Sequence, residues 1–172
     1  WGLFDLDSGE YLTRFPAQSA GLTWFAWLPD SSGFATLAVD DGQRHLNLYD
    51  DDGVLIDTLL TVDEILLPLN FRWSPDGERF LVSLFDPQEN ENRLYMGNRE
   101  SKTLNDLCLL LDPTHRGTPD GAAAWSPDGT RLALVVAESD LPRFQILDLT
   151  TRRRLAAAGY TGGILTWTEK TE

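Results

Sequence analysis

Trp125-Ser126-Pro127-Asp128-Gly129 decides the fold of this chain, because the same five residue types occur in the same order as Trp73-Ser74-Pro75-Asp76-Gly77. A degenerate copy, Trp27-Leu28-Pro29-Asp30, carries Ser31-Ser32-Gly33 where the single glycine would be, which we interpret as an insertion. Proline fixes φ and lacks the amide donor that a sheet requires, so a strand must end there. Aspartate can accept a hydrogen bond from the backbone two residues later, and glycine takes positive φ without strain. Each copy therefore predicts a strand, a tight turn and a second strand.

A second kind of hairpin, with an acidic turn, lies between these copies. Residues 46–49 and 54–56 flank Asp50-Asp51-Asp52-Gly53, and comparable turns occur at residues 98–101 and 148–152. Residues 1–16 form a similar hairpin around Asp7-Ser8-Gly9. The repeating unit is therefore four strands, which we label a to d: a and b flank the proline turn, and c and d flank the acidic turn.

Tryptophans mark the period of this unit. Trp27, Trp73, Trp125 and Trp167 are spaced by about 40–50 residues, which is typical of propeller blades. Prolines and glycines interrupt the sequence too often for a helical solenoid. The sequence predicts an all-β protein, a β-propeller built of four-stranded antiparallel blades. Complete blades are expected at residues 21–60, 67–111 and 121–158.

The two ends of the chain predict one incomplete blade. Residues 1–16 supply strands c and d, and residues 163–168 supply strand a, but Thr168-Glu169-Lys170 replaces the turn that would lead to strand b. Three arrangements remain open: a segment of a larger propeller, a ring completed by another chain, or a closed ring of four blades. Because uncovered strand edges promote association, we expect these edges to pair with the rest of a parent propeller or with a second copy.

Composition limits the classes of partner. The 172 residues carry 27 acidic and 14 basic side chains, a net charge of −13, which disfavours nucleic acids and anionic membrane surfaces. No apolar run approaches the roughly 20 residues needed to span a bilayer. Cys108 is the single cysteine, so no internal disulfide or zinc cluster is expected, and its apolar neighbours predict a buried side chain.

The sequence shows no catalytic set. His45 is expected to be a packed or solvated strand residue, and His115 lies in the polar stretch 112–120. There is no Gly-x-Ser-x-Gly elbow, phosphate-binding loop or dinucleotide fingerprint. Asp50-Asp51-Asp52-Gly53 lacks the spaced ligands of a helix–loop–helix calcium site. We therefore expect no enzymatic activity, no cofactor and no metal.

Loop length predicts where binding occurs. In a propeller, the a–b and c–d turns share one face, and the longer connections, expected at residues 86–92, 112–120, 138–142 and 158–162, share the other. Long loops on a rigid scaffold commonly carry binding. The candidate binding residues are Asp86, Gln88, Glu89, Asn90, His115, Arg116, Glu138 and Asp140. We also expect Trp73 and Trp125 to be buried between neighbouring blades.

The proline turns resemble the WD40-like, TolB-type propeller repeat (PD40), in which an apolar strand and a basic residue, here Arg79 or Arg131, follow the turn. Leu147-Asp148-Leu149-Thr150-Thr151 resembles the c–d turn of the same repeat. The Gly-His and Trp-Asp pairs of true WD40 repeats are missing. The resemblance covers nearly the whole chain and implies that loops and the central channel carry the function.

Two functions follow from this resemblance, since such repeats occur in periplasmic binding scaffolds and in accessory propellers of peptidases. The first is a non-catalytic binding or scaffold module for a protein or peptide, in an extracytoplasmic setting. The alternative is a propeller that gates a prolyl-oligopeptidase-like or tricorn-like peptidase carried elsewhere. A third class, a glycosidase-like propeller enzyme, finds no support in the sequence.

Overall fold

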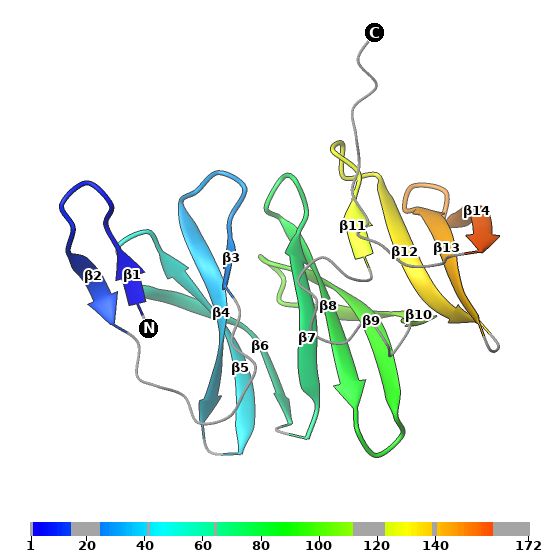
Figure 1. Cartoon of the computed structure of the whole chain (residues 1–172), viewed down its shortest axis with the longest axis horizontal. Coiled ribbons are helices and arrows are strands. Elements are labelled where there is room, and N and C mark those ends of the chain that lie inside the picture. Colours follow the sequence, from blue (N-terminus) through cyan, green and yellow to red (C-terminus); the bar gives the residue numbers. More distant parts are fainter. Residues whose placement is uncertain are drawn as a thin grey trace, which may run out of the picture. The chain divides into compact units, whose positions relative to one another are not determined.

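The computed structural model describes residues 2–14, 25–40, 42–63, 65–111, 123–138 and 141–159. These residues form strands and turns, with no helix among them (Figure 1). Consequently the described part of the chain has no helix that could cross a membrane. The chain divides into two compact units, Trp1–Glu64 and Ile65–Glu172.

The first unit contains a hairpin and one four-stranded sheet. The hairpin pairs β1 (Gly2–Phe4) with β2 (Tyr11–Arg14) in antiparallel fashion. The sheet is an antiparallel meander in the order β3-β4-β5-β6. Its strands are β3 (Phe25–Trp27), β4 (Gly33–Asp40), β5 (Gln43–Asp50) and β6 (Leu55–Asp63).

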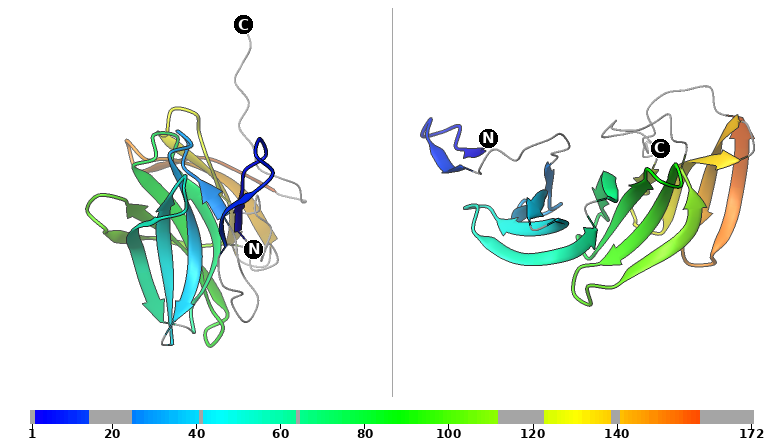
Figure 2. Two further views of the ribbon diagram at one scale, coloured as in Figure 1. Left: turned by 90° about the vertical axis from the view of Figure 1, so that its left-hand side faces the viewer. Right: turned by 90° about the horizontal axis from the view of Figure 1, so that it is seen from below.

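The second unit contains two sheets of the same kind. One comprises β7 (Leu67–Trp73), β8 (Arg79–Asp86), β9 (Glu91–Asn98) and β10 (Leu104–Leu110). The other comprises β11 (Ala123–Trp125), β12 (Arg131–Glu138), β13 (Leu141–Asp148) and β14 (Arg153–Gly159). Both are antiparallel meanders in chain order, and Figure 2 shows in green how β7–β10 twist from strand to strand. The predicted fold class is confirmed, whereas the strand predicted at residues 163–168 lies outside the described residues.

The repeated turn closes as its residues predict. Ser74 Oγ donates a hydrogen bond to the Asp76 carboxylate (2.5 Å) and accepts one from the Arg79 amide (2.9 Å). Asp76 also accepts a bond from the amide of Glu78, two residues later, at 3.0 Å. Gly77 has a φ of 70°, the left-handed region that glycine adopts without strain. Local side-chain chemistry therefore ends β7 and starts β8.

The second full copy repeats this network. Ser126 donates to Asp128 (2.6 Å) and accepts from the amide of Arg131 (2.9 Å), and Asp128 accepts from the amide of Thr130 (3.0 Å). The bonds that Asp128 accepts, the one from Ser126 foremost, lower its pKa to about 2. A carboxylate stabilised in this way is ionised throughout the neutral range.

The degenerate copy has the same length as the other two, so the predicted insertion at Ser31-Ser32 is wrong. Asp30 accepts a bond from the amide of Ser32, two residues later, at 3.0 Å, and Ser31 takes the glycine position with a φ of 63°. Gly33 then stands where the other copies have arginine. A β-carbon at Gly33 would lie 2.2 Å from the carbonyl oxygen of Tyr49, so close strand pairing excludes a larger side chain.

An apolar cluster joins the two sheets of the second unit. Its buried members are Leu81, Leu94, Leu109, Leu111, Ala123, Trp125, Leu132, Leu134 and Val136. They come from β8, β9, β10, β11 and β12 and from Leu111, which bridges to Val136 just after β10. This side-by-side packing is the reason that the two sheets form one compact unit.

The tryptophans that precede the proline turns differ in burial. Trp73 and Trp125 expose only 8% and 9% of their surface, which confirms that both are buried, and Trp125 lies between neighbouring blades as predicted. Trp73 packs edge-on against Phe71 and Phe80 of its own sheet. Trp27, by contrast, is 50% exposed. The sequence repeat therefore does not guarantee equal burial.

Further local predictions are wrong. Cys108 is exposed, because the β9–β10 pairing shifts register between Asp106 and Leu110 and a φ of 54° at Cys108 turns its side chain outward. The connections predicted to be long at residues 86–92 and 138–142 are instead short hairpins. Asp86 of β8 pairs directly with Glu91 of β9, and Glu138 of β12 pairs directly with Leu141 of β13. Pro142 pairs with Ala137 of β12 but lies beyond the β13–β14 ladder, which begins at Arg143, so it is paired on one side only.

Candidate functional site

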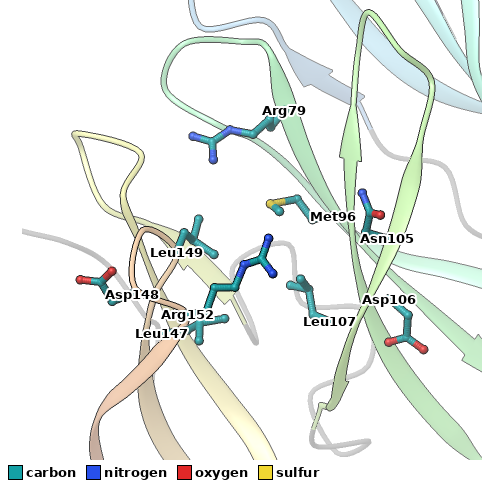
Figure 3. A pocket seen from close by; sticks show the side chains of 9 residues that line it. All are labelled: Arg79, Met96, Asn105, Asp106, Leu107, Leu147, Asp148, Leu149 and Arg152. Carbon is teal, nitrogen blue, oxygen red and sulfur yellow. The ribbon is translucent and has the colours of Figure 1, made fainter.

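A groove of about 530 Å³ lies between the two sheets of the second unit (Figure 3). One wall comes from β8, β9 and β10, and the other comes from the end of β13 and the turn that leads to β14. The lining residues are Arg79, Met96, Asn105, Asp106, Leu107, Leu147, Asp148, Leu149 and Arg152.

The apolar lining is continuous with the core. Met96, Leu107, Leu147 and Leu149 are partly buried and pack against the cluster that joins the two sheets. Met96 and Leu107 belong to one wall, and Leu147 and Leu149 belong to the other. The groove can therefore hold aliphatic groups against both walls.

Arg79 fixes the two walls relative to each other. Its guanidinium Nη2 donates a hydrogen bond to the carbonyl oxygen of Gly129 (3.0 Å), in the turn of the adjacent sheet. The same guanidinium lies 5.1 Å from the ring centre of Trp125, within the range of a cation–π contact. Trp125 Nε1 in turn donates to the carbonyl oxygen of Arg72 (3.4 Å). The basic residue of the repeat thus links one blade to the next.

Both carboxylates of the groove have partners. Asp106 accepts a hydrogen bond from the amide of Cys108 (2.6 Å) and lies 3.6 Å from Arg93 Nη1. Asp148 accepts bonds from the amide (2.8 Å) and hydroxyl (2.9 Å) of Thr151, and its carboxylate lies 3.8 Å from Arg131 Nε. The bond from the Thr151 amide, first among these, lowers the pKa of Asp148. In Figure 3 both carboxylates point away from the space between the walls.

Arg152 differs from these groups. It is an exposed residue of the β13–β14 turn with a φ of 54°, and its side chain extends between the walls toward Met96 and Leu107. Among the residues that the structure describes, no carboxylate pairs with its guanidinium. The groove of this acidic protein therefore presents a positive charge that the described neighbours leave uncompensated.

Four of the predicted binding residues lie together at a different place, the β8–β9 turn. Asp86 accepts hydrogen bonds from the amides of Gln88 (2.8 Å) and Glu89 (3.3 Å), so it shapes the turn. Gln88, Glu89 and Asn90 are exposed. This turn and the groove lie at opposite ends of the β7–β10 sheet. In the β8–β9 ladder, Asp86 pairs with Glu91 next to the turn, whereas Arg79, which lines the groove, pairs with Asn98 at the other end.

The remaining predicted residues join no described cluster. Glu138 ends β12, and only its backbone is described. His115, Arg116 and Asp140 lie outside the described residues. The groove itself was not predicted, although its residues Leu147-Asp148-Leu149 belong to the c–d turn of the repeat.

The described residues give no metal or catalytic constellation. No group of three or more histidine, cysteine or acidic side chains that could hold a metal occurs among them. His45 Nδ1 lies 3.0 Å from Thr61 Oγ1 on the paired strand. Asp50 accepts a bond from the amide of Val54 (2.7 Å), and Gly53 has a φ of 81°, so this acidic segment closes a hairpin.

Comparison with known proteins gives structural neighbours. No protein-family model and no curated protein matches the sequence. TolB from Acinetobacter baumannii is similar in structure, with a TM-score of 0.56 and 17% identity over 76% of this chain and 30% of TolB. An oligogalacturonate lyase in complex with manganese gives a TM-score of 0.59 and 15% identity over 88% of this chain and 40% of the lyase.

A third neighbour is the β-propeller domain of the Trilobed protease from Pyrococcus furiosus. Its TM-score is 0.51 at 11% identity, over 75% of this chain and 39% of that domain. This chain thus spans between 30% and 40% of the length of these three structures. At such identities the likeness shows the fold alone. On this ground, together with its three four-stranded meanders, the chain has a β-propeller fold.

Proposed function

We propose that this chain is a non-catalytic segment of a PD40-type propeller that binds a protein or peptide. The groove between its two adjacent sheets carries the proposal. Its aliphatic walls continue the core, and its volume of about 530 Å³ falls within the range of about 300–1,000 Å³ that is usual for binding pockets. Rigid sheets on both sides would present this surface with little loss of conformational freedom on binding.

Selection from a display library of random short peptides tests this function. Peptides that bind should perturb the NMR signals of the Met96 and Leu149 methyl groups, and Leu149→Ser should weaken their binding. A variant with alanine at Gln88, Glu89 and Asn90 probes the predicted loop face instead. If binding falls only in this triple variant, the β8–β9 turn is the site. If no peptide is enriched over an empty support, the binding function is wrong.

A gating propeller of a peptidase is the second candidate. The resemblance to a protease propeller domain from Pyrococcus furiosus favours it. In this case the groove would contact a catalytic domain or guide a peptide toward it. The coding sequence on both sides of this chain separates the candidates, since an α/β-hydrolase domain in the same polypeptide supports gating. In that case the chain would act as an accessory domain of a peptidase and not as a binding or scaffold module.

A further inference from the structure

We propose that the groove recognises a peptide segment in which an acidic side chain is flanked by aliphatic residues, with Arg152 as its anchor. This inference rests on the proposed function, because it names the class of peptide for the same groove. The juxtaposition that carries it is one uncompensated guanidinium between two aliphatic walls.

The charges of the groove favour an anion. Asp106 and Asp148 are held by Arg93, Arg131 and backbone amides, and they point away from the open space. The Arg152 guanidinium points into that space. Its fork of N–H donors matches a carboxylate in a bidentate geometry. A carboxylate would therefore complete the charge balance of this surface.

The apolar groups favour aliphatic neighbours on both sides of that carboxylate. In Figure 3, Arg152 lies between Leu149 and Leu147 on one wall and Met96 and Leu107 on the other. A side-chain carboxylate inside a segment can be preceded and followed by leucine-like residues, whereas a chain terminus has such a neighbour on one side. This geometry selects an acidic side chain over a terminal carboxylate.

A pair of blocked peptides tests the inference directly. N-acetyl-leucyl-glutamyl-leucinamide carries one side-chain carboxylate, and N-acetyl-leucyl-glutaminyl-leucinamide is its neutral match. Dissociation constants are measured by titrating each peptide and following the methyl signals of Met96, Leu107 and Leu149. The acidic peptide should bind about tenfold more tightly, as expected for a hydrogen bond to a charged group. Added salt should reduce this preference, because the guanidinium is exposed.

Two arginine variants test whether Arg152 causes the preference for the acidic peptide. Arg152→Gln should abolish the discrimination between the two peptides, while Arg153→Gln, an equal charge change at the adjacent exposed residue, should preserve it. Equal binding of both peptides to the wild-type groove would overturn the inference and leave peptide binding intact. Absence of any methyl shift with either peptide would overturn both. Tighter binding of N-acetyl-leucine than of the acidic peptide would show that a terminal carboxylate is the ligand and that the assignment to a side chain is wrong.

Discussion

Replacing Arg79 with alanine removes the side chain that links the β7–β10 sheet to the turn of the next sheet. The lost interactions are the hydrogen bond to the Gly129 carbonyl at 3.0 Å and the contact with the Trp125 ring at 5.1 Å. The Arg79 side chain is 29% exposed, so solvent screens it only in part. The variant therefore measures how strongly the repeat's basic residue holds two blades together.

The magnitude follows from these two contacts. A hydrogen bond from a charged donor contributes about 1.5–3 kcal/mol, and a partly exposed cation–π contact adds about 0.5–1 kcal/mol. The ion pair with Asp76, at 3.7 Å, adds little, since surface pairs are worth about 0–1 kcal/mol. Taking the lower values because of partial exposure, we expect Arg79→Ala to reduce the free energy of unfolding by about 2–3 kcal/mol.

Urea unfolding followed by tryptophan fluorescence measures this loss. Arg131→Ala is the matched control, because Arg131 holds the same position in the next repeat but is 50% exposed and lies 3.8 Å from Asp148. In this control variant the free energy of unfolding should fall by about 0–1 kcal/mol. Arg79→Lys keeps the charge but lacks the planar guanidinium, so its loss of free energy of unfolding should lie between those of the two alanine variants. Equal losses for the two alanine variants would refute the role of Arg79 as a link between blades.

Three further predictions concern single residues. The pKa of Asp128 is about 2 in the folded protein against 3.8 normally, so its contribution to stability is present above pH 3.8 and is lost as the pH falls toward 2. Asp128→Asn should lower stability at neutral pH and flatten its decline over that acid range in urea titrations; an unchanged pH profile would contradict this. Trp125→Ala should reduce the free energy of unfolding by about 3–5 kcal/mol, as for other buried aromatic residues, and an unmoved thermal melting curve would show that the ring contributes little. Gly97→Ala should cost about 1–3 kcal/mol, because a β-carbon would lie 2.1 Å from the Phe80 ring; a variant as stable as the parent in urea would show that the ring moves aside freely.

The exposed apolar residues of the first unit bear on the predicted association. Phe4, Leu6, Phe25 and Trp27 each expose at least 41% of their surface. A contiguous apolar surface is usual where another chain or segment packs, whereas apolar residues exposed singly are normal. The pairing of the terminal strands with the rest of a propeller or a second copy remains a prediction, because strand a at residues 163–168 is outside the described part.

The sequence by itself determined the blades. Proline, aspartate and glycine at fixed spacing act on their own backbone, so the hydrogen bonds of Asp76 and Asp128 could be predicted without knowing any distant contact. The two kinds of turn and the repeat period then implied four-stranded antiparallel sheets. The acidic hairpin turn at Asp50 could be predicted for the same reason, because its carboxylate bonds to the backbone of its own hairpin.

Only the tertiary structure decided the contacts between blades. Arg79 and Gly129 are 50 residues apart, and no local pattern states that the guanidinium of one reaches the carbonyl of the other. The exposure of Cys108 depends on a register shift in one ladder. Likewise, the groove exists because two walls distant in sequence pack side by side and leave Arg152 between them. The sequence determines such contacts only through the packing of whole sheets, and for this reason local chemistry predicted the blades but not the groove.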